Sequence, residues 1–148
     1  MKVNSIIISA FFILILTFCG FEIINSPLIQ QKPDPSQLKD KGVGPIKALK
    51  LNAVDQKLAD KGSELFDSKC SPCHHINDVN LGPALRGVTK NLSPEFIMNY
   101  LMNTAEMQKK NPYVLKLIQS WKKVPMMKDQ KLKEKDSRAI LEFLRTQQ

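Results

Sequence analysis

The chain has 148 residues and a formal net charge of +8, from 22 Lys and Arg against 14 Asp and Glu. This length excludes two sizeable domains, because compact cores form in units of about 100 to 150 residues. A basic excess of this size suits nucleic acid, anionic lipid or an acidic protein partner.

Residues 1–24 have the features of an export signal. Lys2 supplies a positive charge, and residues 6–18 form an apolar run of typical length. The run ends in Leu-Thr-Phe-Cys-Gly, which resembles a bacterial lipoprotein signal with Cys19 as the lipidated residue. A soluble secreted form and an uncleaved membrane anchor are the alternatives. All three place the rest of the chain outside the cytoplasm, in the periplasm, and export argues against nucleic acid as a partner.

Residues 25–52 are predicted to form a flexible tether. They are rich in Pro, Gln, Lys and Asp and have few apolar side chains to bury. The alternative is an N-terminal arm that lies on the domain, since Ile46, Leu49, Leu51 and Val54 have apolar side chains that can pack.

Residues 53–148 are predicted to form one all-α domain, because no segment alternates apolar and polar residues with the period of two typical of a strand. The first helix is expected over residues 55–69. It contains Gly62, and an interior glycine costs about 1 kcal/mol relative to alanine. We therefore expect another backbone to approach Gly62 closely, and the last helix is the candidate.

Three further helices are expected in the second half of the chain. One begins at Ser93, which can cap the free amides, with Pro94 in the first turn. Another covers residues 112–121 and also starts with a proline. The last covers residues 133–145 and has an apolar stripe beneath a charged surface.

Directly after the first helix, the chain contains Cys70-Ser-Pro-Cys73-His74. This is the pattern for covalent attachment of one c-type haem, in which each thiol forms a thioether with a haem vinyl group and the adjacent imidazole binds the iron. His75 follows, and we expect it to face solvent or cap the core, because His74 already has the position that the pattern assigns to iron.

Two other kinds of site use the same residues. A structural zinc site requires four ligands, and Cys19, the remaining cysteine, is remote from the motif. A thiol-disulfide enzyme also uses two cysteines at this spacing, but its motif lies beside βαβ elements, which this chain is not expected to form. The motif therefore favours haem.

A second axial ligand decides between electron transfer and ligand chemistry. Met126 and Met127 follow a proline in the loop between the third and last predicted helices. We expect one of them to bind the iron opposite His74, and Met126 is preferred to Met127. The alternative is that both only cover the haem. Core packing is expected instead for the methionines that lie on or just after the second helix, namely Met98, Met102 and Met107.

The first helix, the cysteine motif, the methionine loop and the last helix follow one another in this order. Residues 53–146 thereby resemble a class I c-type cytochrome. The resemblance implies a cytochrome c fold, with helices wrapped around one covalent haem. It implies that the Pro83 carbonyl accepts the ring N–H of His74 and that Leu85 packs on the haem. It also makes Arg86 and Trp121 candidate partners of the haem propionates.

The function expected from this resemblance is one-electron transfer in a respiratory chain by an exported monohaem protein that is not itself an enzyme. The alternatives are a haem subunit of a larger oxidoreductase, and a haem enzyme or gas sensor with an open distal site. Lysines near the methionine loop suit an acidic redox protein as partner. These lysines are Lys109, Lys110, Lys116, Lys122, Lys123, Lys128, Lys131, Lys133 and Lys135.

Overall fold

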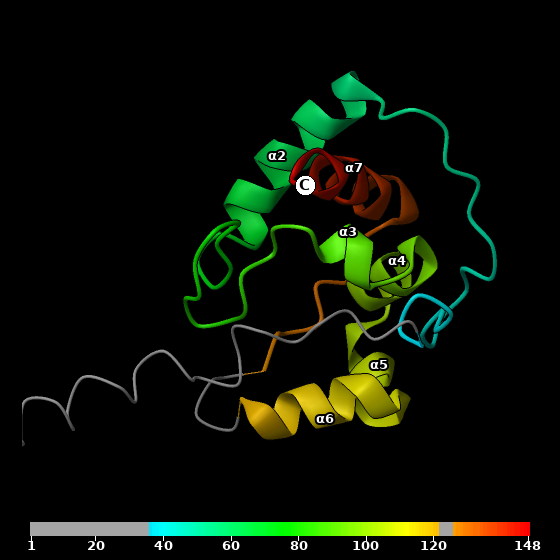
Figure 1. The fold of residues 1–148 in the computed structure, drawn as a ribbon, viewed down its shortest axis with the longest axis vertical. Helices are drawn as coiled ribbons and strands as arrows, with labels where there is room; N and C mark the ends of the chain where they lie inside the picture. The colour runs from blue at the N-terminus through cyan, green and yellow to red at the C-terminus, as the bar shows by residue number, and fades with distance from the viewer. Residues whose placement is uncertain (1–35, 122–125) are drawn as a thin grey trace, which may run out of the picture. The chain divides into compact units, whose positions relative to one another are not determined.

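The computed structural model describes residues 36–121 and 126–148. Helices and loops make up this part of the chain, which contains no strand (Figure 1). The helices are α2 (Gln56–Lys69), α3 (Val88–Asn91), α4 (Pro94–Met102), α5 (Thr104–Lys110), α6 (Pro112–Ser120) and α7 (Glu134–Thr146). The all-α prediction is confirmed. The export signal, Cys19, the first part of the predicted tether, and Lys122 and Lys123 lie outside the described residues.

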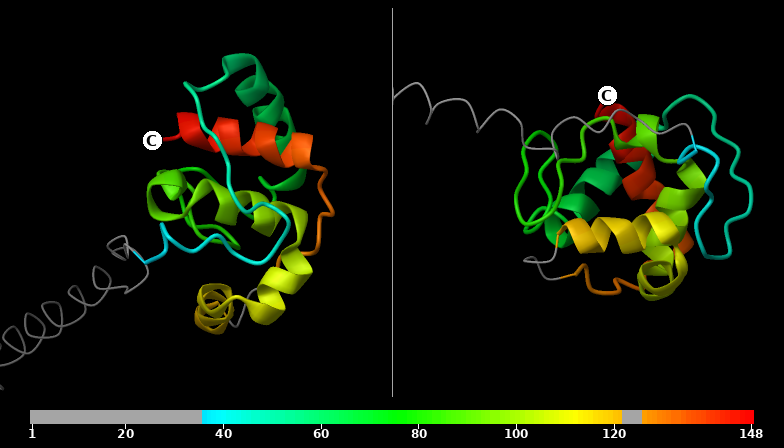
Figure 2. Two further views of the ribbon diagram at one scale, coloured as in Figure 1. Left: turned by 90° about the vertical axis from the view of Figure 1, so that its right-hand side faces the viewer. Right: turned by 60° about the horizontal axis from the view of Figure 1, so that its bottom comes forward.

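Helices α2 and α7 cross in close contact, as Figure 2 shows from two sides. At the crossing, a side-chain carbon added to Gly62 would overlap the backbone carbonyl of Ala139. The rings of Phe66 and Phe143 meet beside this point, with centroids 5.2 Å apart. The glycine therefore permits the contact between the first and last helices that the sequence predicts.

Polar side chains fix where three helices begin. The Asp55 carboxylate accepts the backbone N–H of the third residue along at 3.0 Å, and so α2 starts after it. Ser93 caps α4 and Asn111 caps α6 in the same way, each with a bond of 3.0 Å. Because each cap satisfies an amide that would otherwise lack a partner, the starts predicted at Ser93 and residue 112 are present.

Two short helices differ from the prediction. The predicted second helix ends at Asn103, whose φ of −142° and ψ of 43° are not helical, and α5 follows as a separate element. Helix α3 lies in a segment expected to be loop and begins after Gly87, which has a φ of +70°. Because glycine has no Cβ, it adopts a positive φ without steric cost, and so it is suited to the boundary between a loop and a helix.

The core lies where α7 packs against both α2 and α4. Its fully buried side chains include Met98, Ile140 and Leu141, and Phe66 and Ile97 are nearly so. A second cluster, formed by Phe96, Met107 and Val114, holds α5 and α6 against α4. Met98 and Met107 are thus core residues, as expected from the sequence. None of the helices in the described part of the chain is long and apolar enough to cross a membrane.

Residues 40–49 form an ordered arm that lies against α4 (Figure 1). The buried side chain of Asn99 donates to the carbonyls of Lys41 and Ile46, at 2.8 and 2.9 Å, and accepts the Ile46 N–H at 3.0 Å. The Ile46 side chain is itself buried. Over these residues the structure differs from the flexible tether predicted for residues 25–52, because side chains far along the sequence satisfy the backbone of the arm.

Candidate haem site

The cysteine motif forms a tight turn at the end of α2. The Cys70 N–H donates to the Phe66 carbonyl at 2.8 Å and ends the helix. The Cys70 carbonyl then accepts the N–H groups of Cys73, at 3.0 Å, and His74, at 2.8 Å. Both thiols and the imidazole therefore belong to one hydrogen-bonded turn whose start is fixed by a helix.

The two thiols have different environments. Cys73 is exposed, whereas Cys70 is half-buried, and both are free. Burial raises the pKa of Cys70 to about 11; the charge of Lys69 opposes this shift, and repulsion by Cys73 adds to it. Before haem is attached, the Cys70 sulfur is therefore a thiol rather than a thiolate at neutral pH.

The His74 ring is held by the loop that follows the motif. Its Nδ1 lies 3.0 Å from the Pro83 carbonyl oxygen, and since a carbonyl only accepts, Nδ1 carries the proton. The preceding residue, Gly82, lies flat against the ring: a side-chain carbon there would be 2.6 Å from Nδ1. The Gly82 N–H in turn donates to the Cys73 carbonyl at 2.8 Å.

This arrangement fits the haem that the motif implies. With the proton on Nδ1, the other ring nitrogen, Nε2, keeps its lone pair and can bind a metal. A hydrogen bond from the first nitrogen to a carbonyl is the usual support of a metal-binding histidine, because it fixes the orientation of the ring and raises its basicity. The contact implied by the resemblance, from His74 to Pro83, is present in the structure.

His75 lies at the surface. Its side chain is exposed, with Nε2 at 3.3 Å from the amide nitrogen of Asn80, as expected for a solvent-facing histidine. Its carbonyl accepts the Leu85 N–H at 3.1 Å, which ties the two ends of the loop together. His75 thus supports the loop through its backbone.

Met126 and Met127 lie in a loop that precedes α7, which we call the methionine loop (residues 126–132). The Met126 side chain is 55% exposed, whereas that of Met127 is half-buried. The Met127 carbonyl accepts a hydrogen bond of 2.8 Å from the side chain of Gln108 on α5. Sequence reasoning missed Gln108, because a single glutamine on a helix belongs to no motif.

The structure gives the protein contacts of three residues that the resemblance brings toward haem. Arg86 donates from Nε to the Asn77 side chain at 2.6 Å and from Nη1 to the Gln148 carbonyl at 3.0 Å. Leu85 packs against the core. Trp121 is half-buried and ends α6 through its N–H. Arg86 therefore joins Asn77, through Nε, to Gln148, through Nη1.

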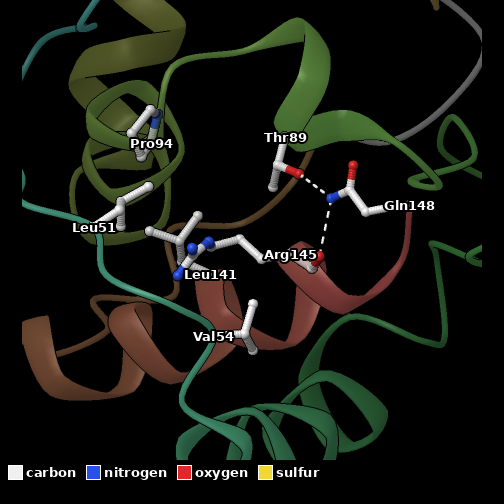
Figure 3. A pocket seen from close by; sticks show the side chains of 7 residues that line it. All are labelled: Leu51, Val54, Thr89, Pro94, Leu141, Arg145 and Gln148. Atoms are coloured by element: carbon white, nitrogen blue, oxygen red, sulfur yellow. Dashed lines mark hydrogen bonds between the residues drawn. The ribbon is translucent and has the colours of Figure 1, made fainter.

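A pocket of about 260 Å³ lies on another part of the domain (Figure 3). Apolar residues line part of it, together with Arg145, Thr89 and Gln148. The Arg145 guanidinium is already occupied, because it bonds to the buried Glu142 at 2.6 Å and to the Asn52 carbonyl at 2.7 Å. No residue of the cysteine motif lines this pocket.

The described residues also bear on the zinc alternative. Within residues 36–121 and 126–148, no three side chains of His, Cys, Asp or Glu come together in a group that could hold a metal ion. Cys70, Cys73 and His74 therefore do not form such a group by themselves in this part of the chain.

Comparisons with known proteins agree with this geometry. Residues 59–148 match the family model described as cytochrome c. A solved cytochrome c from Rhodothermus marinus is 39% identical, with a TM-score of 0.68 over 76% of this chain and 96% of that one. Its engineered variant Rma TDE is also 39% identical, with a TM-score of 0.65 over 70% of this chain and 89% of that one. No curated protein is significantly similar to the chain.

Proposed function

Because the chain belongs to the cytochrome c family, whose members carry covalent haem c for electron transfer, we propose that it is an exported one-electron carrier of a respiratory chain. The observation that carries the proposal is the support of His74 by Pro83 and Gly82. That support uses Nδ1 and leaves Nε2 to bind iron, directly after two cysteines, which is the donor set for covalent haem.

Each residue of the site has a distinct task in this proposal. Cys70 and Cys73 would hold the haem through thioether bonds, and His74 would bind the iron through Nε2. Pro83 keeps the proton on Nδ1 and the ring in place. When bound, haem with His and Met ligands supplies a single-electron iron couple of raised potential. Met126, or Met127 in its place, would supply a sulfur as the second ligand of the iron.

The proposed partner is an acidic redox protein. Lys109 and Lys110 are 70% and 63% exposed, and Glu106 pairs with both, at 3.7 and 2.6 Å. Lysines outnumber acids from this point to the start of α7, where the methionine loop also lies. A positive surface beside the site favours rapid encounter with an acidic surface and a short-lived complex.

Cytochromes c are typically extracytoplasmic proteins. We propose the periplasm for this chain, because residues 1–24 have the pattern of an export signal. Lipidation of Cys19 would hold the domain at a membrane surface. Growth with a labelled fatty acid tests this, because a Cys19→Ser variant should lose the label if the cysteine carries lipid.

The reduction potential and CO binding of the recombinant holoprotein test the closed coordination of the iron. The wild type should exclude CO, because a sulfur occupies the distal position. Of Met126→Ala and Met127→Ala, one should bind CO and have a lower potential, and that variant identifies the ligand. CO binding by the wild type would favour an open site, as in a gas sensor, over a carrier.

A further inference from the structure

The side chain of Gln108 joins the methionine loop to a helix. Its Nε2 donates to the Met127 carbonyl at 2.8 Å, across 19 residues of sequence. Gln108 is half-buried and lies on α5, next to Met107, which is fully buried. The donor is therefore attached to a part of α5 that cannot move without disturbing the core.

Tyr100 on α4 lies beside Gln108. Burial raises the pKa of Tyr100, and hydrogen bonding from the Gln108 side chain opposes this rise. Tyr100 is itself held in place: its ring stacks on that of Phe96, with centroids 6.3 Å apart, and its carbonyl accepts the hydroxyl of Thr104 at 2.7 Å, across the break between α4 and α5. A well-packed residue therefore flanks the glutamine that reaches the loop.

The methionine loop has little other support from outside itself. In the described part of the chain, its remaining hydrogen bonds are local: Gln130 donates to the Lys128 carbonyl at 3.3 Å, and the Lys131 N–H donates to Asp129 at 3.1 Å. The Leu132 side chain is buried at the far end, just before α7. At the methionine end, the hydrogen bond from Gln108 joins the described residues of the loop to a helix.

From these contacts we propose that Gln108 is a positioning residue for the axial sulfur: by fixing the peptide after Met127, it holds the methionine loop closed against the iron. This inference rests on the proposed function, because it requires a methionine ligand. The inference applies whether Met126 or Met127 binds the iron. The peptide group that Gln108 fixes directly follows Met127 and lies one residue beyond Met126.

The test uses the ferric holoprotein and imidazole, which competes with the sulfur for iron. Loss of one neutral hydrogen bond should make displacement easier, and we expect the Kd for imidazole to fall about fivefold in Gln108→Leu. Gln108→Glu keeps the size of the side chain but, when ionised, has no hydrogen-bond donor. This variant should therefore behave like Gln108→Leu. The sulfur-to-iron charge-transfer band should weaken in both variants.

Gln130→Leu is the matched control. It also removes a glutamine amide that donates to a carbonyl of the methionine loop, but that bond is exposed and local. The control should have the Kd and the band of the wild type. If both Gln108 variants also match the wild type, the inference is overturned while the proposed function stands. If the wild type itself lacks the band and binds imidazole as an open haem does, the methionine ligand is wrong.

Discussion

Gly62 and Gly82 are among the glycines whose close contacts leave no room for a side chain. Gly62 faces the backbone of Ala139, and Gly82 faces the ring of His74. The first permits the crossing of two helices, and the second permits the loop to support an imidazole. The same property of glycine, the absence of Cβ, thus serves the fold at one position and the site at the other.

Replacement of Gly62 tests the first contact. Gly62→Ala should lower the free energy of unfolding by about 3 kcal/mol, because the added methyl overlaps a backbone carbonyl that cannot turn aside. Gly87→Ala is the control: Gly87 is left-handed but has nothing near it, and a loss of about 1 kcal/mol is expected from conformation alone. Denaturant unfolding of the holoproteins measures both. Equal losses would contradict the account of the crossing.

Titration of Tyr100 tests its bond to Gln108. Burial raises the pKa of Tyr100 above its ordinary value of 10.0, and the hydrogen bond with Gln108 opposes the rise. Removing that bond in Gln108→Leu should therefore raise the pKa further. The chain has two tyrosines, so that in a Tyr113→Phe background ¹³C NMR of labelled tyrosine follows Tyr100 alone. A lowered pKa would contradict the contact.

The same shifts set a pH dependence of stability. Burial raises the pKa of both Tyr100 and Tyr113 above 10.0. In the unfolded chain the phenols ionise at the ordinary value, while in the folded chain they ionise only at higher pH. The stabilisation of the folded state that the two buried phenols contribute is therefore fully present below pH 10.0. It is lost as the pH rises through the pKa values that the two tyrosines have in the folded chain.

At the scale of elements, local signals and distant partners explain what the sequence could and could not predict. The starts of α2, α4 and α6 follow from capping residues that lie beside them. The ordered arm could not be predicted in this way, because its partner Asn99 lies 53 residues from Ile46. The segment is polar in composition, and only contacts across the fold distinguish it from a flexible tether.

Replacement of Asn99 tests how the arm is held. Asn99→Leu keeps the approximate volume but removes the three bonds to Lys41 and Ile46. We expect a loss of about 3 kcal/mol, because buried backbone groups are left without partners, and much faster exchange of the Ile46 amide. Asn103→Leu is a milder control, since Asn103 makes one bond to the Val43 carbonyl, at 3.2 Å. Unchanged exchange at Ile46 would contradict the role of Asn99.

The site shows the same division between local and distant information. Cys70, Cys73 and His74 could be identified from sequence because covalent attachment requires a fixed short spacing. Pro83 followed from the resemblance. Gln108 could not be found, since it acts on a backbone carbonyl 19 residues away, and any residue can supply a carbonyl.

At the scale of the whole molecule, the charge of +8 should govern encounters with a partner. Electron transfer to an acidic redox protein should slow steeply as salt rises from about 0.01 to 0.15 M, because the screening length falls from about 30 to 8 Å. A double variant, Lys109→Gln with Lys110→Gln, should be slower at low salt and depend less on salt. Stopped-flow mixing measures both rates. A rate independent of salt would exclude electrostatic steering.

The account depends most on covalent haem held by the cysteine motif. Mass spectrometry of the holoprotein, expressed with a haem-attachment system and then denatured, tests this directly. The wild type should retain the mass of one haem, and a Cys70→Ala, Cys73→Ala double variant should retain none. A wild-type chain that emerges from denaturation without haem would contradict the account.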